Sequence, residues 1–257
     1  MVVPPHGSLP AAPSPVAPLR PPPPPHPTLP LAVAVGALIC VAVPLIAGGQ
    51  LLAPVDALEL PIALYVAIAV AVVYGPSMIW WWFASARYGS GRRDIDVGLM
   101  ARPSDLGWGP LAWLGCLLVQ AVIGFLVTRF DVPFTSNTEA LGDGDDDLRF
   151  IIAIVVLTVV VAPITEEIVF RGMVLRGLLG SMGPTAAITL QAVLFGVAHI
   201  SPGFGLGNIG LVMVLTGVGG VLGVVAHIFR RITPCILAHA ILNAVSVTLA
   251  LAGVGQS

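Results

Sequence analysis

Two adjacent glutamates, Glu166 and Glu167, follow an apolar run of the chain and lead directly into Ile-Val-Phe-Arg171. Ionisable side chains are expensive inside a bilayer, where they usually mark a pathway or a reacting site. An apolar site disfavours the ionised carboxylate, and a second carboxylate beside it acts in the same direction. Either glutamate is therefore a candidate general base that polarises a water. Arg171 lies one helical turn beyond Glu167 and favours its negative charge, which indicates a supporting role for Glu167.

A histidine is expected at the same depth as the first glutamate. The segment Gly180-Ser-Met-Gly-Pro184 is a helix stop followed by a helix start, and it predicts an antiparallel hairpin. Glu166 and His199 are almost equally far from the centre of this turn, about 24 Å at helical rise. The hairpin therefore brings a carboxylate and an imidazole together. Phe195 precedes His199 by one turn and either packs a helix interface or supports the site.

His239 and Asn243 form a second polar pair, spaced i and i+4 on the last apolar stretch. This spacing places both side chains on one helix face. They could donate hydrogen bonds to a developing oxyanion. Alternatively, Glu166, His199 and His239 could hold a zinc ion that carries the water. The sequence leaves the metal-free and the zinc mechanism open, and it predicts no certain cofactor.

Three segments carry a family resemblance. Glu166–Arg171, Phe195–His199 and His239–Asn243 resemble the EExxxR, FxxxH and HxxxN motifs of the CPBP intramembrane proteases. This family includes the CAAX prenyl proteases of the Rce1 type and the bacteriocin-processing or immunity proteins also called the Abi family. The resemblance covers about residues 150–250 and leaves the preceding part of the chain without a matched motif.

The resemblance implies an endopeptidase that acts within the membrane. The family's water-activating base is matched by Glu166, which works together with the histidine matched by His199. The positions of His239 and Asn243 are assigned to oxyanion stabilisation or, alternatively, to metal binding. The position of Arg171 supports the glutamates.

The composition excludes an ordinary soluble domain. The chain is 57% hydrophobic and 9% charged, whereas globular domains carry about 25% charged residues. Its mean hydropathy of +0.98 is typical of a polytopic helical membrane protein. The net charge of -2 is accompanied by no extended basic surface, so nucleic acid is not an expected partner. Arginine without any lysine suggests a GC-rich, bacterial genome.

We expect an all-α, polytopic transmembrane bundle of about seven spans. Residues 1–30 are proline-rich and are predicted to form a disordered tail. Residues 31–149 are predicted to form the N-terminal transmembrane helices. Residues 150–253 are predicted to form a catalytic core of the CPBP or Abi type. The apolar stretches are Leu31–Ala53, Pro61–Ala86, Pro110–Thr128, Leu148–Leu179, Pro184–Ile200, Asn208–Phe229 and Thr233–Gly253.

The arginines predict an orientation. Most of them fall on one side of a seven-span arrangement, and only Arg129 and Arg149 fall on the other. By the positive-inside rule, the N-terminus is cytoplasmic. The sequence therefore predicts an integral plasma membrane protein, with a membrane-embedded or lipid-modified peptide or protein as its substrate.

Two other function classes fit the same residues. A non-catalytic membrane protein of the bacteriocin-immunity type would retain the fold without the reaction. An ion-coupled transporter could use membrane carboxylates and histidines as a relay. The transporter would be favoured by inverted repeats with broken helices, and no such repeat is visible in the sequence.

Overall fold

The computed structural model describes residues 28–58, 60–138 and 148–253, which form helices and connecting turns without any strand. Its helical elements are α1 (Leu31–Asp56), α2 (Ile62–Tyr88), α3 (Arg93–Val97), α4 (Asp105–Arg129), α5 (Leu148–Val156), η2 (Leu157–Val161), α6 (Ala162–Glu167), η3 (Ile168–Val174), α7 (Leu175–Leu179), α8 (Pro184–Val197), η4 (Pro202–Gly207), α9 (Asn208–Phe229) and α10 (Thr233–Leu251). Within these residues, six helices are long and apolar enough to cross a membrane, and α8 is a shorter apolar helix. The predicted all-helical bundle of about seven spans is confirmed.

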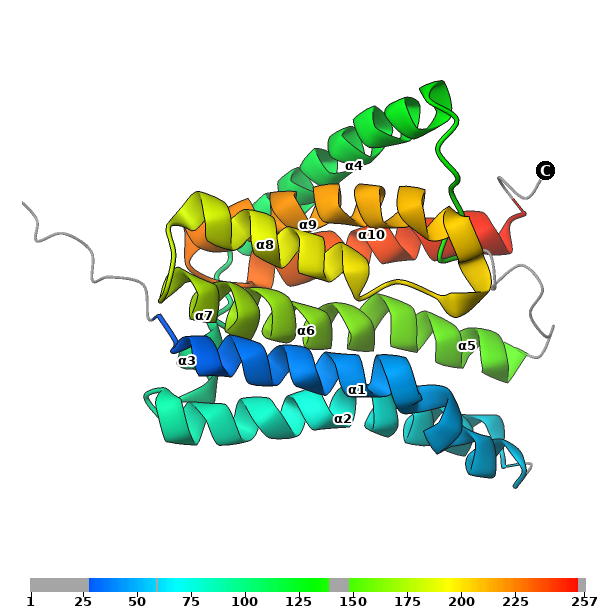
Figure 1. Ribbon diagram of the computed structural model, residues 1–257, viewed down its shortest axis with the longest axis horizontal. Coiled ribbons are helices and arrows are strands. Elements are labelled where there is room, and N and C mark those ends of the chain that lie inside the picture. The colour runs from blue at the N-terminus through cyan, green and yellow to red at the C-terminus, as the bar shows by residue number, and fades with distance from the viewer. Residues whose placement is uncertain (1–27, 59, 139–147, 254–257) are drawn as a thin grey trace, which may run out of the picture.

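The helical rod from Leu148 to Leu179 lies at the centre of the bundle. Figure 1 shows this rod, labelled α5, α6 and α7, between α1 on one side and α8, α9 and α10 on the other. Two π segments, η2 and η3, flank the short helix α6. Such π turns occur frequently at functional sites, because they change the register of side chains along a helix. Glu166 and Glu167 close α6, so the π segments directly adjoin both carboxylates.

The helix α8 is shorter than the predicted span Pro184–Ile200. It has 14 residues and is therefore about 21 Å long at 1.5 Å per residue. Ser201 adopts an extended conformation in front of Pro202, because the proline ring disfavours a helical residue at that position. The helix ends at Val197, and His199 lies in the following turn rather than on the helix.

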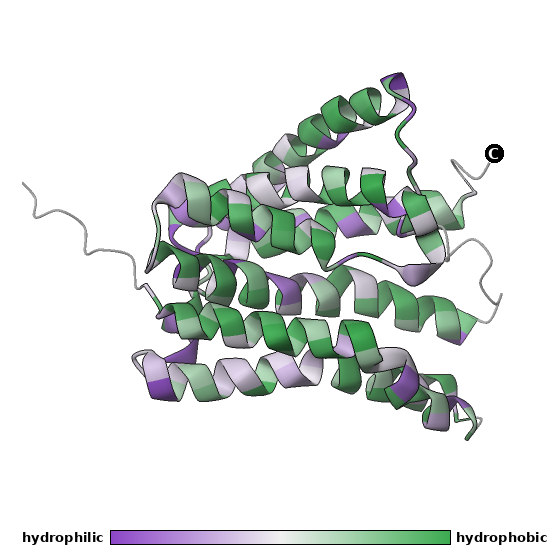
Figure 2. Ribbon diagram, in the orientation of Figure 1, coloured by the Kyte–Doolittle hydropathy of each residue, from purple (hydrophilic) through white to green (hydrophobic). Residues whose placement is uncertain are grey.

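Apolar side chains cover the outside of the bundle as well as its interior. Hydrophobic residues dominate every long helix in Figure 2, and large side chains such as Ile39, Ile79 and Leu118 are exposed. In a soluble protein such a surface would aggregate, whereas hydrocarbon accommodates it. The surface therefore agrees with a membrane location.

Glycine allows α8 and α9 to approach closely. A Cβ atom at Gly196 would lie 2.6 Å from the hydroxyl oxygen of Thr216 and 2.7 Å from the carbonyl oxygen of Val212. Helix pairs in membranes commonly use small residues in this way. The close contact fixes the end of α8 and with it the turn that carries His199.

Two buried arginines tie the connecting segments to one end of the bundle. Arg231 forms a buried ion pair with Asp105 and so joins the start of α10 to the start of α4. Arg176 donates hydrogen bonds to the backbone carbonyls of Ile95, Asp96 and Arg230. The short helix α3 is thereby fixed against the central rod.

The proline-rich tail falls largely outside the described residues. Of the predicted segment 1–30, only residues 28–30 are described, and there Leu29 is buried and donates its N–H to the carbonyl of Arg176 at 3.3 Å. The chain is therefore already attached to the bundle at Leu29, just before α1 begins.

Candidate active site

Glu167 is the centre of a fully buried polar cluster. Its Oε1 accepts hydrogen bonds from Nη1 of Arg171 at 2.7 Å and from Nδ1 of His239 at 3.0 Å. The side chains of Glu167 and Arg171 are both 0% exposed. Arg171 also donates to the carbonyl of Gly219 on α9 at 3.4 Å. Buried charges are tolerated when they are paired and hydrogen-bonded, so this cluster joins the central rod to α9 and α10.

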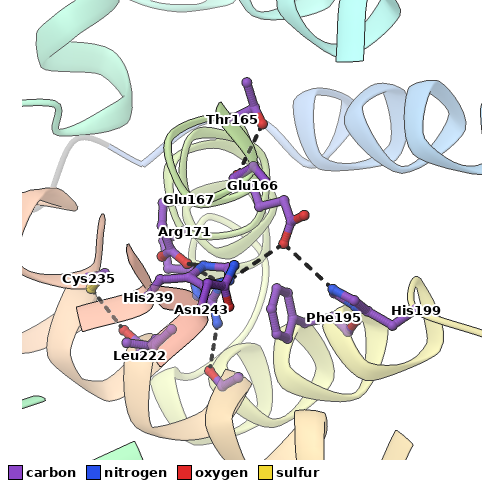
Figure 3. Close-up of polar contacts among 12 residues, drawn as sticks. Thr165, Glu166, Glu167, Arg171, Phe195, His199, Leu222, Cys235, His239 and Asn243 are labelled. Atoms are coloured by element: carbon purple, nitrogen blue, oxygen red, sulfur yellow. Dashed lines mark hydrogen bonds and ion pairs between the residues drawn. The ribbon is translucent and has the colours of Figure 1, made fainter. Parts of the chain in front are cut away.

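Glu166 points away from this cluster, toward two imidazoles. Figure 3 shows its carboxylate directed to His199 on one side and His239 on the other. Its Oε2 lies 3.6 Å from Nε2 of His199 and 3.9 Å from Nε2 of His239. Among the described residues, this buried oxygen has no hydrogen-bond partner. A buried carboxylate oxygen normally accepts a hydrogen bond, so a donor such as a water is expected beside it.

The other ring nitrogens of the two histidines are engaged. Nδ1 of His199 lies 2.7 Å from the carbonyl oxygen of Phe195, and Nδ1 of His239 faces the Glu167 carboxylate. A carbonyl and a carboxylate oxygen only accept hydrogen bonds, so both Nδ1 atoms carry a proton. In the neutral imidazoles each Nε2 is therefore an acceptor, directed toward Glu166.

Phe195 packs between the polar groups. The guanidinium carbon of Arg171 lies 4.4 Å from its ring centroid, and the ring of His199 meets it edge to face at 4.7 Å. It also makes edge contacts with Phe170 and His239. The ring separates Arg171 from the His199 side of the site and limits the movement of both imidazoles.

Asn243 occupies the next turn of α10 after His239. Its amide nitrogen donates one hydrogen bond to the carbonyl oxygen of Thr158 in η2 at 2.8 Å. An amide has two N–H groups, so one donor remains for another acceptor. The structure thus places the seven residues of the three motifs, Phe195 included, in one region of the bundle.

The zinc alternative requires Glu166, His199 and His239 to act as ligands. Within the part of the chain that the structure describes, no group of three or more His, Cys, Asp or Glu side chains is placed to hold a metal ion. Carboxylate and imidazole are suitable zinc ligands, and Oε2 of Glu166 lies 3.6 and 3.9 Å from the two Nε2 atoms. If a zinc ion were bound, these three side chains would hold it and it would supply an acidified water.

A cavity of about 370 Å³ opens onto Glu166 and His199. Its walls are mainly apolar and come from α1, α2, α6, η3 and the turn that follows α8. The residues lining it are Val41, Pro44, Leu45, Val73, Tyr74, Ser77, Glu166, Val169, Phe170, Ala198 and His199. An apolar pocket with a few convergent polar groups is the usual form of a small-molecule or peptide site.

One polar contact of Glu166 was not predicted. The hydroxyl of Tyr74 on α2 donates a hydrogen bond to Oε1 of Glu166 at 3.3 Å. In the sequence, Tyr74 stands within a long apolar span and is part of no motif. The available signal was a tyrosine in the middle of that span, followed by Pro76 two residues later.

Comparison with known families agrees with these motifs. Residues 148–245 match the family model described as type II CAAX prenyl endopeptidase, Rce1-like. The similarity covers less than half of the chain, and residues 148–245 are called the Rce1-like domain after the family that they resemble. No curated protein and no solved structure matches the chain.

The Rce1-like domain begins with α5 and ends within α10, so it contains the two glutamates, Arg171, both histidines and Asn243. The helices α1 to α4 lie outside it. At the level of the family, the match supports a CAAX-type intramembrane protease. Together with the long apolar helices, it identifies the chain as an integral membrane protein.

Proposed function

We propose that the chain is an intramembrane endopeptidase that hydrolyses a peptide bond with a water activated by Glu166. One observation carries this proposal. Oε2 of Glu166 is buried and lacks a hydrogen-bond partner within the described residues, yet it faces Nε2 of both His199 and His239. The Rce1-like match supports the reaction class.

In the proposed reaction, a water binds between Glu166 and His199. The carboxylate oxygen and the imidazole nitrogen are 3.6 Å apart, so the water lies beside the pair and donates a hydrogen bond toward each. The water oxygen attacks the scissile carbonyl carbon while Glu166 takes one proton, and His199 accepts a hydrogen bond from the other. Glu166 then returns its proton to the leaving amine nitrogen as the carbon–nitrogen bond breaks.

The oxyanion would be stabilised from α10. Asn243 keeps one free amide N–H after its bond to Thr158. His239 holds a proton on Nδ1 toward Glu167, so it becomes a donor at Nε2 only as the imidazolium. We therefore assign the oxyanion donors to Asn243 and protonated His239.

Glu167 and Arg171 support the reaction without contacting the substrate. Their ion pair is completely buried, and Glu167 fixes the ring of His239 through Nδ1. Glu166 is thus the carboxylate that reacts, and Glu167 is the carboxylate that orients the neighbouring side chains.

The substrate is proposed to be a membrane-embedded or lipid-modified peptide. The cavity beside Glu166 is lined mainly by apolar side chains of α1 and α2, which suits an aliphatic group next to the scissile bond. We place the arginine-rich end of the bundle, with the N-terminus, on the cytoplasmic side of a plasma membrane.

Peptide cleavage by the purified protein in lipid nanodiscs tests this function. The substrates are a fluorescence-quenched peptide with a C-terminal Cys-aliphatic-aliphatic-X sequence, prenylated and unmodified. We expect turnover by the wild type and loss of about 100-fold or more in Glu166→Gln and His199→Ala. Equal turnover in all three proteins would refute the assignment.

The non-catalytic alternative has a separate test in cells. An immunity-type role depends on the fold and not on the reaction. Glu166→Gln preserves the shape of the side chain but removes the base, so a cellular phenotype that survives this change would favour the non-catalytic role. No observation of the structure favours the ion-coupled transporter.

A further inference from the structure

Tyr74 reaches the active site from outside the Rce1-like domain. It lies on α2, and its hydroxyl donates a hydrogen bond to Oε1 of Glu166 at 3.3 Å. It also lines the cavity beside Glu166 and His199. The family match begins only at residue 148. The proposed base therefore faces the two histidines with Oε2 and accepts a hydrogen bond from a phenol at Oε1.

The pair formed by α1 and α2 keeps Tyr74 in place. Trp80 on α2 donates its indole N–H to the carbonyl of Val33 on α1 at 3.0 Å. The same indole packs directly against Gly36, where a Cβ atom would overlap the ring. α2 in turn contacts α5 and η3 of the central rod. The phenol is thus carried by a helix that is fixed on two sides.

We propose that Tyr74 is a positioning residue for Glu166, an inference that rests on the proposed function. By occupying Oε1, the hydroxyl fixes the carboxylate plane so that Oε2 is the oxygen that faces His199 and His239. Because the phenol donates, it also stabilises the ionised carboxylate that the reaction requires. The N-terminal helix pair is then part of the active site and more than a membrane anchor.

The other groups that act on Glu166 are known from the structure. His199 and His239 face its Oε2, and Arg171 acts on it from one helical turn away. None of these contacts involves Oε1. Loss of the Tyr74 hydroxyl therefore leaves Oε1 without its donor but keeps the three basic side chains in place.

The test uses Tyr74→Phe, with Tyr65→Phe as the matched control. Both changes remove one hydroxyl from α2, but Tyr65 lies near the start of the helix, beside Asp56 and away from the cavity. In Tyr74→Phe we expect kcat to fall about tenfold with little change in KM. The acid limb of the pH profile of kcat/KM should move about one pH unit upward, since the ionised carboxylate has lost a donor. Tyr65→Phe should resemble the wild type.

A second readout does not depend on activity. Hydrophobic carbodiimides react with protonated carboxyl groups in apolar sites, and mass spectrometry measures the labelling of the peptide that contains Glu166. Glu166→Gln separates this signal from labelling of Glu167. The pH midpoint of labelling should rise in Tyr74→Phe. A fluorinated tyrosine at position 74, whose hydroxyl is a stronger donor, should lower it.

These outcomes distinguish the two proposals. If the labelling midpoints of Tyr74→Phe and Tyr65→Phe agree, the positioning role is wrong even if the wild type is an active protease. If the wild type cleaves no peptide but the midpoint shifts as expected, the endopeptidase fails and the Tyr74–Glu166 coupling stands. Thermal unfolding of both variants, expected to match the wild type, identifies any general loss of structure.

Discussion

His239 meets Glu167 through Nδ1 at 3.0 Å, so the last helix of the bundle is oriented by the second glutamate and not by the first. The imidazole is 5% exposed and Glu167 is completely buried. This contact leaves Nε2 of His239 directed toward Glu166. The two adjacent carboxylates therefore have different partners, and their substitution should have different consequences.

Replacing Glu167 by glutamine should destabilise the fold. The change leaves the guanidinium of Arg171 buried without its counter-charge, and breaking such a pair costs about 3–5 kcal/mol. Reversible unfolding in detergent measures the loss. Because the double variant Glu167→Gln/Arg171→Met removes both charges, it should recover part of the stability. If Glu167→Gln alone were as stable as the wild type, the structural role of this ion pair would be contradicted.

Replacing His199 by alanine should remove activity but little stability. Its side chain is 20% exposed at the cavity, and its Nδ1 donates a hydrogen bond to the carbonyl of Phe195 one turn earlier. Loss of a group that handles a proton lowers the rate by about 100-fold or more. We expect peptide turnover to disappear while the unfolding transition stays close to that of the wild type. A parallel loss of both would indicate that His199 mainly holds the turn after α8.

Removal of divalent metal should leave turnover unchanged. The proposed reaction uses a water held by Glu166 and His199 and needs no metal ligand set. Activity is compared before and after dialysis against a zinc chelator, followed by addition of zinc. A loss that zinc restores would overturn the metal-free mechanism and return Glu166, His199 and His239 to the role of ligands.

Introducing alanine at Gly196 should push α8 away from α9. The added Cβ atom would overlap Thr216 and the carbonyl of Val212, and overpacking of this kind costs about 1–3 kcal/mol. We expect lower thermal stability and reduced turnover, since the turn with His199 follows directly. Gly220→Ala is the matched control, because a Cβ atom there meets nothing within 4 Å. Equal behaviour of the two variants would contradict close packing at Gly196.

The short helix α3 should show an acid-dependent stability. Burial favours the protonated form of Asp96, but hydrogen bonds from Ser85 and Ser90 outweigh it and lower the pKa of this carboxyl. A lowered pKa in the folded state adds stability that is present above the unfolded value of about 3.9 and is lost as the pH falls below it. Ser85→Ala should reduce this contribution. Thermal unfolding between roughly pH 3 and 7 measures the difference, and a pH-independent difference between the two proteins would argue against it.

Much of the site can be predicted from the sequence, because the rise of a helix per residue is constant and turns are marked by glycine and proline. The turn at Gly180–Pro184 and the spacing of Glu166 and His199 were enough to predict their meeting, which the structure shows at 3.6 Å. The i and i+4 spacing likewise placed His239 and Asn243 on one face. These features depend only on distance along a helix.

Other features depend on how separate helices pack, and a single sequence does not reveal them. The contact between Tyr74 and Glu166 joins residues 92 positions apart. The π segments beside the glutamates change which side chains face each other, although the apolar pattern of the rod looks like that of an ordinary span. The end of α8 before His199 has a visible cause, since Pro202 stands close behind it.

The pairing of the glutamates also sets an order for assembly in the membrane. Glu167 finds Arg171 within the same helix, so this pair can neutralise itself while the central rod is inserted. Glu166 forms no such ion pair within the described part of the rod, and it meets His199 and His239 only after α8 and α10 have followed. Before that, the hydroxyl of Tyr74 on the earlier helix α2 is the group placed to donate to it. The complete polar environment of Glu166 therefore exists only in the finished bundle.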